Sequence, residues 1–468
     1  MARLIAVSNR VSPPTEAGVA TAGGLAMALA AALRESSGIW FGWSGRTVET
    51  YTGQLSIDRV GGVTVATVDL DEQDRLEYYN GYANKTLWPL FHYRMDLAAY
   101  ERSFDAGYVR VNERFADALV PLVEPDDILW VQDYHLLPLA RELRQRGITN
   151  RLGFFLHIPW PARRVFTTLP RHEDLVSALL DYDLIGFQTQ DDCDAFASYL
   201  TQSTNGVVTG SGLVSAFGKQ SRIGAFPIGI DTVDFQHAAS SPLALDAFKG
   251  MRRSMAGRKM ILGVDRLDYS KGLEERFLAY EQVLADRPDL LEKVFLLQIA
   301  TLSRDDVDAY QDLRARLDAV SGRINGAFAT VEWVPIRYVN RSYRRDQLAG
   351  IYRAAQVGLV TPLRDGMNLV AKEYVAAQDP DNPGVLVLSE FAGAAAQLSA
   401  ALIINPFSRE DTAEAIRRAL VMPKAERRSR WRDLMDGVAR DTVEMWRDRF
   451  VGALQAASRA DAAIPARG

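Results

Sequence analysis

The sequence predicts an α/β protein with two doubly wound domains. Short runs of Val, Ile, Leu and Phe alternate with longer helical patterns along nearly the whole chain, which is typical of βαβ units and mostly parallel sheets. A polar, loop-prone stretch at residues 231–242 interrupts this series, and the 468-residue chain is long enough for more than one domain. Strand-type runs are predicted at residues 4–8, 128–132, 152–156, 184–188, 225–230, 260–264, 294–299, 330–335, 357–361, 385–388 and 402–404.

The changes in pattern also set the predicted domain boundaries. We expect a first domain at residues 1–235 and a second at residues 236–440. Residues 441–468 begin with an amphipathic helix, predicted at 442–454, which packs back toward the first domain and ends in a frayed tail.

The composition limits the classes of function. A net charge of -5 and a pI near 5.7 argue against a nucleic-acid-binding surface. No apolar run approaches the roughly 18 residues that a membrane span needs. The one cysteine, Cys193, excludes an internal disulfide and a multi-cysteine metal site, and fits a reducing compartment. We therefore expect a cytoplasmic protein whose partners are small molecules, with neither nucleic acid nor membrane among them; a homo-oligomer stays open.

Polar side chains follow three strands of the first half. Arg10 follows the strand at residues 4–8, Asp133 follows 128–132, and His157 follows 152–156. Because the carboxyl ends of parallel strands share one edge, where α/β sheets bind ligands, these side chains are predicted to meet at one rim. A buried Asp can also cap a helix and a buried His can bond a carbonyl group, but their shared placement favours a site.

Two further features of the first half have both a binding and a structural interpretation. Gly23 and Gly24 precede a helix predicted at residues 25–34, where a phosphate could approach the backbone closely, although a tight turn is the more usual reason for such a pair. The stretch at residues 77–94, with Tyr79 and Trp88, is rich in aromatic side chains that suit sugar rings, while packing is the more frequent role of any single ring.

The second half carries cations at its strand ends. Arg266 and Lys271 lie in the loop that follows the strand at 260–264, just before Gly272 and a helix. A guanidinium and an ammonium beside a helix N-terminus suit a diphosphate, whereas a solvated pair of cations is the alternative. Arg304 follows the strand at 294–299.

The segment at residues 357–373 organises the second half. A short apolar strand ends at Pro362, a turn carries Asp365, and a helix runs from Leu369 to Ala377 with Glu373 about one turn in. The helix N-terminus favours an anionic ligand. The two carboxylates suit sugar hydroxyl groups, although Asp365 could merely cap the helix.

Taken together, cations for phosphate and carboxylates for hydroxyl groups indicate a phosphorylated or nucleotide-linked sugar. Two domains that face each other across a cleft would bring both sets of residues around one pair of ligands. Five histidines without a His-Glu-x-x-His pattern make a zinc site improbable, and no metal or other cofactor is expected.

The chain resembles the trehalose-6-phosphate synthase family, which are retaining glycosyltransferases of the GT-B type with two Rossmann-like domains. The resemblance extends from residue 7 to about residue 405 and includes the whole segment 365–373. It is carried by specific motifs: Trp40-Phe41-Gly42-Trp43-Ser44-Gly45, Leu87-Trp88-Pro89, Asp133-Tyr134-His135-Leu136, Phe154-Phe155-Leu156-His157-Ile158-Pro159 and Arg266-Leu267-Asp268-Tyr269-Ser270-Lys271-Gly272. One departure is Gln132, which stands where some relatives have His.

The resemblance implies a role for each half. The first domain would bind the acceptor, glucose 6-phosphate, and the second the donor, UDP-glucose. The implied acceptor-binding residues are Arg10, Tyr79, Trp88, Asp133 and Arg304, and the implied catalytic residues are Asp133, His157, Arg266, Lys271 and Asp365. The implied donor-binding residues are Gly23, Gly24, Arg266, Lys271, Tyr343, Asp365, Leu369, Val370, Ala371, Lys372 and Glu373.

The resemblance further implies attack from the face that the leaving group departs from, without a covalent intermediate and without a metal. A covalent intermediate would need a carboxylate against the anomeric carbon, and the only candidate, Asp365, would bind hydroxyl groups instead. The alternatives are a glucosylglycerol-phosphate synthase, which has another phosphorylated acceptor, and a catalytically silent sugar-phosphate sensor. A dehydrogenase is disfavoured because the dinucleotide fingerprint is absent. The sequence does not choose between UDP-, ADP- and GDP-glucose.

Overall fold

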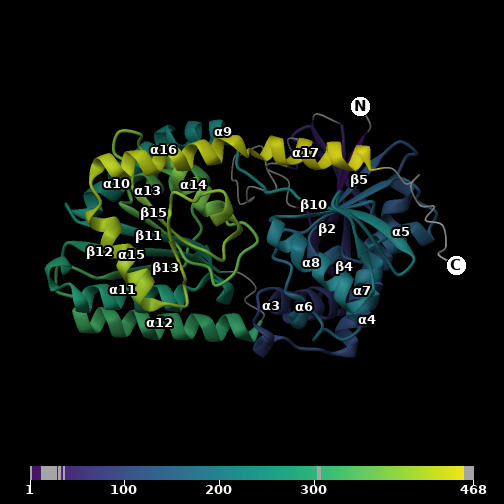
Figure 1. Cartoon of the computed structure of the whole chain (residues 1–468), viewed down its shortest axis with the longest axis horizontal. Coiled ribbons are helices and arrows are strands. Elements are labelled where there is room, and N and C mark those ends of the chain that lie inside the picture. Colours follow the sequence, from purple (N-terminus) through teal and green to yellow (C-terminus); the bar gives the residue numbers. More distant parts are fainter. Residues whose placement is uncertain (1–2, 12–28, 30–32, 35–36, 303–306, 458–468) are drawn as a thin grey trace. The chain divides into compact units, whose positions relative to one another are not determined.

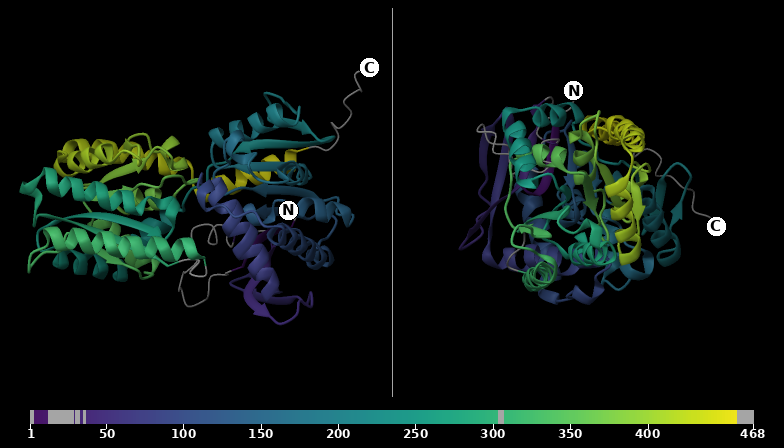
Figure 2. Two further views of the ribbon diagram at one scale, coloured as in Figure 1. Left: turned by 90° about the horizontal axis from the view of Figure 1, so that it is seen from below. Right: turned by 90° about the vertical axis from the view of Figure 1, so that its left-hand side faces the viewer.

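The chain divides into two compact units in a computed structural model that describes residues 3–11, 29, 33–34, 37–302 and 307–457. Unit 1 comprises Met1–Pro227 and Glu444–Gly468, and unit 2 comprises Ile228–Val443. Each unit has one mainly parallel sheet with helices against it (Figures 1 and 2). The predicted α/β class with two Rossmann-like domains is therefore confirmed.

The sheet of unit 1 has, within the described residues, the strand order β3-β4-β2-β1-β5-β6-β7-β10-β9-β8. The strands from β4 to β10 in this order pair in parallel, and β3, β9 and β8 pair antiparallel at the two edges. The bounds are β1 Leu4–Arg10, β2 Ile39–Val48, β3 Ser56–Val60, β4 Val63–Asp71, β5 Ile128–Gln132, β6 Arg151–Phe155, β7 Leu184–Phe187, β8 Val207–Val208, β9 Leu213–Ala216 and β10 Lys219–Ala225.

The central strands of this sheet are apolar runs because both of their faces are covered. Every residue of β5 and of β7 is buried, as expected for parallel strands between helical layers. The helices of unit 1 are α2 Glu72–Asp74, η1 Arg75–Leu87, α3 Trp88–Phe91, η2 Met95–Leu97, α4 Arg102–Leu119, η3 Val120–Leu122, η4 Tyr134–Leu136, α5 Leu139–Gln145, α6 Arg163–Phe166, α7 His172–Leu179 and α8 Gln190–Ser203.

Helix α17 (Val443–Ala456), from the far end of the chain, completes the core of unit 1. Its Phe450 stacks on Trp130 of β5 with ring centroids 4.9 Å apart. Gly153 of β6 has no side chain where Phe450 and Leu454 pack, since a Cβ atom there would lie 2.6 Å from Leu454. Figure 1 shows this helix, in yellow, beside β5 and β10.

Unit 2 contains a six-stranded sheet, all parallel in its described residues, in the order β13-β12-β11-β14-β15-β16. The strands are β11 Lys259–Arg266, β12 Val294–Thr301, β13 Ile336–Val339, β14 Val357–Val360, β15 Val385–Ser389 and β16 Leu402–Ile404. In chain order this arrangement is 3-2-1-4-5-6, the order of the doubly wound dinucleotide-binding fold.

The helices of unit 2 form two layers, one on each face of its sheet (Figure 1). One layer holds α11 Leu273–Asp286, α12 Asp308–Phe328 and α15 Arg409–Val421. The other holds α9 Thr232–Ala239, α10 Pro242–Met255, α13 Arg345–Ala354, α14 Leu369–Ala377 and α16 Lys424–Arg440, and the short helices are η5 Tyr269–Lys271, η6 Pro288–Leu290 and η7 Gly393–Ala396. Across the described part of both units, none of the helices is long and apolar enough to cross a membrane.

Two predicted strands are wrong. The run at 225–230 is not a strand, because β10 ends at Ala225 and the chain stops pairing with β7 after Phe226, before Pro227, which has no N–H to donate. The run at 330–335 forms a tight turn in which Thr330 and Trp333 bond each other, and the strand begins only at Ile336.

Candidate active site

Each sheet reverses its strand order at one point, and predicted site residues lie at both points. In unit 1 the reversal falls between β1, which ends at Arg10, and β5, which is followed by Asp133. In unit 2 it falls between β11, which ends at Arg266, and β14, which leads to Asp365. Ligands of open α/β sheets bind beyond the carboxyl ends of the strands at such points.

An ion pair marks the reversal point of unit 2. The Nζ of Lys271 lies 2.6 Å from Oδ2 of Asp365, and only 10% and 15% of the two side chains are exposed. Asn368 donates from Nδ2 to the same Asp365 oxygen at 3.0 Å. Arg266, in contrast, is exposed at the end of β11. The ion pair therefore places a cation that suits an anionic ligand directly beside a carboxylate that suits hydroxyl groups.

The loop that carries Lys271 is tied to the loop that carries Asp365. The carbonyl of Ser270 accepts hydrogen bonds from the backbone N–H groups of Leu363 and Arg364, at 2.8 and 3.4 Å. Gly272 has φ 63°, and a Cβ atom there would lie 2.3 Å from the carbonyl oxygen of Thr361, so the turn requires glycine. The position of the ammonium is therefore set by backbone geometry.

A buried guanidinium supports both loops from below. Arg276 of α11 is fully buried and donates to Asp265, at 2.5 Å, and to Gln298, at 2.7 Å. Its Nε donates to Oγ1 of Thr361 at 3.0 Å. This network joins the ends of β11, β12 and β14. It could not be predicted from the sequence, because an Arg in a helical pattern is ordinarily solvated.

The N-terminus of α14 faces the carboxyl end of β14. Asn368, with φ 78°, caps this helix and accepts from the N–H of Ala371 at 3.3 Å. The N–H groups of the first helical turn, at Leu369 and Val370, have no carbonyl partner within the helix, which makes such a terminus favourable for phosphate. Asn368 was not among the predicted site residues, although the turn before the helix could have indicated an N-cap.

Two neighbouring residues of α14 have shifted pKa values. Burial raises the pKa of Glu373 to about 7, and Tyr352 donates to its carboxylate at 3.2 Å. Burial lowers the pKa of Lys372 to about 7. The Nζ of Lys372 donates to the carbonyl of Ile228 at 2.7 Å and to Oε1 of Gln397 at 2.6 Å. These contacts are with groups other than the carboxylates of Asp365 and Glu373.

Asp133 holds a strained backbone at the reversal point of unit 1. Its φ and ψ are 74° and 167°, a region that non-glycine residues rarely occupy and that costs on the order of 1–3 kcal/mol. Its Oδ1 accepts from the backbone N–H of His157 at 3.1 Å, which joins the ends of β5 and β6. Such strain is concentrated at functional sites, so the geometry supports a role for this residue.

His157 has a partner on each ring nitrogen. Its Nε2 lies 2.9 Å from Oε1 of Gln132, and its Nδ1 lies 3.4 Å from Nε2 of Gln188. Burial lowers the pKa of His157 to about 3, so the ring is uncharged near neutral pH. Neither glutamine was predicted as a site residue, because an apolar strand ending in Gln carries no distinctive pattern.

Aromatic rings and one guanidinium line the same end of unit 1. The guanidinium of Arg10 lies 5.8 Å from the ring centroid of Trp43, whose ring lies 5.6 Å from that of Tyr79. Tyr79 also stacks on His135 at 6.0 Å. It belongs to η1, a π-helix of a kind that is rare and often found at functional sites. Trp43 belongs to one of the family motifs, and its contact with Arg10 adds it to the candidate residues.

The remaining predicted site residues have less to connect them. Trp88 is buried and tilted against His92 and Tyr134. Tyr343 lies two residues before α13 and is partly exposed. Gly23, Gly24 and Arg304 lie outside the described residues.

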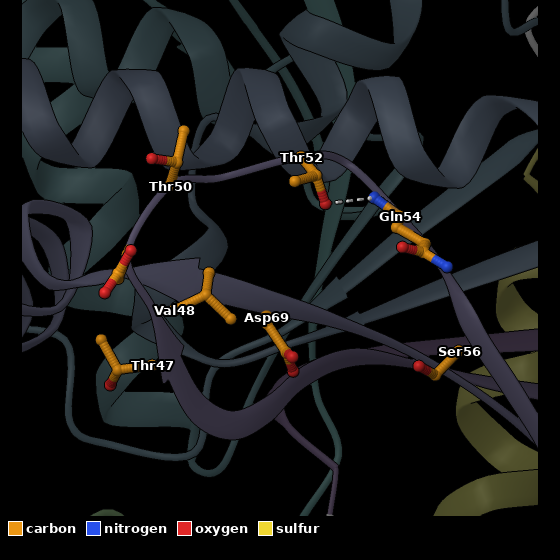
Figure 3. A pocket seen from close by; sticks show the side chains of 8 residues that line it. Thr47, Val48, Thr50, Thr52, Gln54, Ser56 and Asp69 are labelled. Carbon is orange, nitrogen blue, oxygen red and sulfur yellow. Dashed lines mark hydrogen bonds between the residues drawn. The ribbon is translucent and has the colours of Figure 1, made fainter.

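A separate hollow of about 740 Å³ opens in unit 1 beside the end of β2. Figure 3 shows the polar side chains that line it, among them Thr47, Thr50 and Asp69, and the bond from the N–H of Gln54 to Thr52. It shares no residue with the reversal-point cluster. Asp69 accepts from Ser44 and lies 3.6 Å from Arg46. Within the described ranges, no group of three or more His, Cys, Asp or Glu side chains is arranged to hold a metal ion.

Comparison with known proteins gives a family and several similar chains. The model of glycosyltransferase family 20 matches residues 7–456. A trehalose-6-phosphate synthase of Sinorhizobium fredii is 50% identical over 460 residues, which cover 98% of this chain and 99% of that protein. An α,α-trehalose-phosphate synthase (UDP-forming) of Burkholderia xenovorans, solved with glucose-6-phosphate, is 50% identical with a TM-score of 0.93, covering 97% of this chain and 100% of that one. A structure from Escherichia coli bound with UDP-2-fluoro glucose is 48% identical with a TM-score of 0.93, covering 97% and 99%.

Proposed function

The chain belongs to glycosyltransferase family 20, and from this premise we propose that it is an α,α-trehalose-phosphate synthase (UDP-forming). It moves glucose from UDP-glucose to glucose 6-phosphate and releases trehalose 6-phosphate and UDP. The observation in this chain that carries the proposal is the Lys271–Asp365 pair beside the N-terminus of α14, at the reversal point of a doubly wound sheet.

Unit 2 binds the donor in this proposal. Arg266 and Lys271 hold the diphosphate, together with the first N–H groups of α14 at Leu369 and Val370. Asp365 binds hydroxyl groups of the donor glucose. The contacts of its carboxylate with Lys271 and Asn368 keep that carboxylate in one orientation. Glu373, one turn farther along the helix, accepts from the ribose hydroxyl groups.

Tyr343 lies near the uracil, and Gly23 and Gly24 approach the donor phosphates through their backbone. Ala371 and Lys372 contribute backbone groups of the same helical turn, since the Lys372 ammonium is bonded to Ile228 and Gln397.

Unit 1 binds the acceptor in this proposal. Arg10 of unit 1 and Arg304, which belongs to the sequence of unit 2, neutralise the phosphate of glucose 6-phosphate. Tyr79, Trp88 and Trp43 form apolar walls for the sugar ring. Asp133 and His157 meet the sugars at the reaction centre. The strained backbone of Asp133 fits this role, because it holds the carboxylate in a direction that a relaxed strand end would not give.

The chemistry follows from the placement of charge. As the glycosidic bond to UDP lengthens, the diphosphate gains negative charge, and the cations at Arg266 and Lys271 stabilise that charge more strongly than they stabilise the ground state. The acceptor hydroxyl attacks from the same face, and its proton passes to the departing phosphate oxygen. The configuration of the glucose is therefore retained, and no metal is required in this proposal because protein cations act on the phosphates.

The similar proteins favour this function over the alternatives. A glucosylglycerol-phosphate synthase would need a different acceptor, whereas the chains that match at 50% identity over nearly their whole length are named for trehalose 6-phosphate. A silent sensor would not need a carboxylate paired with a cation at the donor end. A cytoplasmic location also belongs to the proposal.

Product identification tests the proposal. The purified protein is offered UDP-, ADP- and GDP-glucose with glucose 6-phosphate or glycerol 3-phosphate, and the product is identified by NMR. We expect trehalose 6-phosphate with both anomeric centres in the α configuration. A glucosylglycerol phosphate, an inverted anomer, or no transfer with any pair would overturn the proposal.

A further inference from the structure

The ring of His157 is held between two buried amides. Gln132, at the end of β5, and Gln188, just after β7, are 0% and 1% exposed. Because β6 lies between β5 and β7 in the sheet, these side chains approach the imidazole that follows β6 from both sides. The distances are 2.9 Å from Nε2 to Oε1 of Gln132 and 3.4 Å from Nδ1 to Nε2 of Gln188.

The orientation of the Gln132 amide follows from its second contact. Its Nε2 donates to the carbonyl of Trp130 at 3.5 Å. Reversing the amide would place its oxygen against that carbonyl oxygen, where neither atom has a hydrogen to donate. The amide oxygen therefore faces His157 and accepts from Nε2–H. The opposite nitrogen, Nδ1, then has its lone pair free to accept from the Gln188 amide, so both contacts agree on one tautomer.

We propose that Gln132 is a positioning residue, which fixes His157 as an uncharged imidazole with its hydrogen on Nε2 and so keeps this histidine out of proton transfer. The inference rests on the proposed function and deepens it. In that reaction the proton of the acceptor hydroxyl passes to the departing phosphate oxygen, and no proton passes through the ring. The ring stays uncharged and contributes its shape to the site beside Asp133.

The surroundings of the ring support a neutral state. Around the imidazole, β6 contributes the ring of Phe155, with 4.7 Å between ring centroids. α17 contributes the ring of Trp446, with 6.0 Å between ring centroids. The charged group in contact from the end of β5 is Asp133, and its carboxylate binds the backbone N–H of His157. Burial accordingly lowers the pKa of the ring to about 3. If a carboxylate replaced the Gln132 amide, it would stabilise a protonated His157 ring, which has no such negative partner at that position in the native protein.

The test measures the ring directly. Protein with ¹⁵N-labelled histidine is titrated from pH 5 to 9 by NMR, and the His157 signals are assigned by their loss in His157→Asn. We expect one neutral tautomer with hydrogen on Nε2 and no titration. Gln132→Glu keeps the accepting oxygen and adds a charge, so its His157 should titrate within this range. Its kcat/KM should then fall about tenfold per pH unit below that new pKa.

Two variants separate positioning from mere packing. Gln132→Met has a similar shape and no acceptor, so we expect a mixture of tautomers and a loss of activity that does not depend on pH. Gln202→Glu, on the exposed face of α8, adds the same charge and should leave the ring and the pH profile unchanged.

The outcomes are distinguishable. A wild-type His157 that titrates between pH 5 and 9, or that carries its hydrogen on Nδ1, overturns the inference, even if Gln132→Glu fails to fold. A pH profile of Gln132→Glu identical to the wild type, with a titrating ring, overturns the claim that neutrality matters for the reaction. Failure to form trehalose 6-phosphate, with the ring in the expected tautomer, rejects the proposed function and leaves the assignment of the tautomer supported.

Discussion

The ammonium of Lys271 lies 2.6 Å from a carboxylate oxygen of Asp365, across two loops that follow different strands. The two groups therefore neutralise each other until a ligand arrives. In the proposed function, the diphosphate of the donor competes for the cation and a hydroxyl group of its sugar competes for the carboxylate. A nucleotide sugar would then replace both contacts at once, whereas free UDP would replace only the contact to the cation.

The first prediction separates the two partners of this pair. Lys271→Met should weaken UDP binding roughly 10- to 150-fold, because a hydrogen bond to a charged group contributes about 1.5–3 kcal/mol. Asp365→Asn should leave UDP affinity unchanged or tighter, because the ammonium is released, but should reduce kcat with UDP-glucose. Calorimetry with UDP and steady-state rates measure both. Equal losses of UDP affinity in the two variants would contradict separate roles.

The second prediction concerns backbone strain at Asp133. Asp133→Gly and Asp133→Ala both lose the carboxylate, and both should lose most activity. Only glycine relieves the φ of 74°, so the glycine variant should be more stable than the alanine variant by about 1–3 kcal/mol. Denaturant unfolding measures the difference. Two variants of equal stability would show that the strained conformation is not maintained in solution.

The third prediction uses the raised pKa of Glu373, about 7 in the folded protein against an ordinary 4.5. Between these values the folded state holds a proton that the unfolded state has lost, so stability falls as pH rises from 4.5 to 7 and is constant above. Glu373→Gln removes this loss and should be more stable than the wild type above pH 7, by up to about 3 kcal/mol. The exposed Glu113→Gln is the control, and an advantage that does not grow with pH would refute the assignment.

The fourth prediction tests how Lys372 contributes. Its ammonium bonds the carbonyl of Ile228 and Oε1 of Gln397, so Lys372→Met should remove two buried hydrogen bonds and cost about 1–3 kcal/mol of stability. Donor affinity should stay within about twofold, since only the backbone is assigned to the donor. Thermal unfolding and UDP binding are compared with Lys424→Met, an exposed control. A tenfold loss of UDP affinity would instead place the side chain at the donor.

The fifth prediction is that the reaction needs no divalent cation. The diphosphate charge is met by Arg266 and Lys271 in the proposed mechanism, so activity should survive EDTA with less than about twofold loss. The product is quantified by NMR before and after chelation. Complete loss that magnesium restores would show that protein cations are insufficient.

The sequence predicts the carboxyl ends of strands well, because an apolar run followed by a polar residue is a local signal. The strand Ile128–Gln132 and the helix Leu369–Ala377 were predicted with the bounds that the structure has. The reversal points follow from these ends once the strand order is known. The position of Asp133 at one of them is therefore predicted from the sequence, while its role stays a prediction.

Contacts between distant segments could not be predicted in the same way. Nothing local to Arg276 indicates that its guanidinium lies buried against Asp265 and Gln298, since the pattern of an amphipathic helix places Arg in solvent. The direction of the Lys372 side chain is likewise set by Gln397, twenty-five residues later. Such roles depend on tertiary packing rather than on any motif.

The position of α17 has a consequence for how the protein is made. A ribosome completes the strands of unit 1 and then synthesises residues 228–443 before α17 exists, which takes roughly 10–40 s at 5–20 residues per second. During that interval the nascent chain lacks the side chains of α17 that pack on Trp130 and at Gly153, among them Trp446, Phe450 and Leu454. The core of unit 1 is therefore completed only after α17 has been synthesised, on the far side of unit 2 in the sequence.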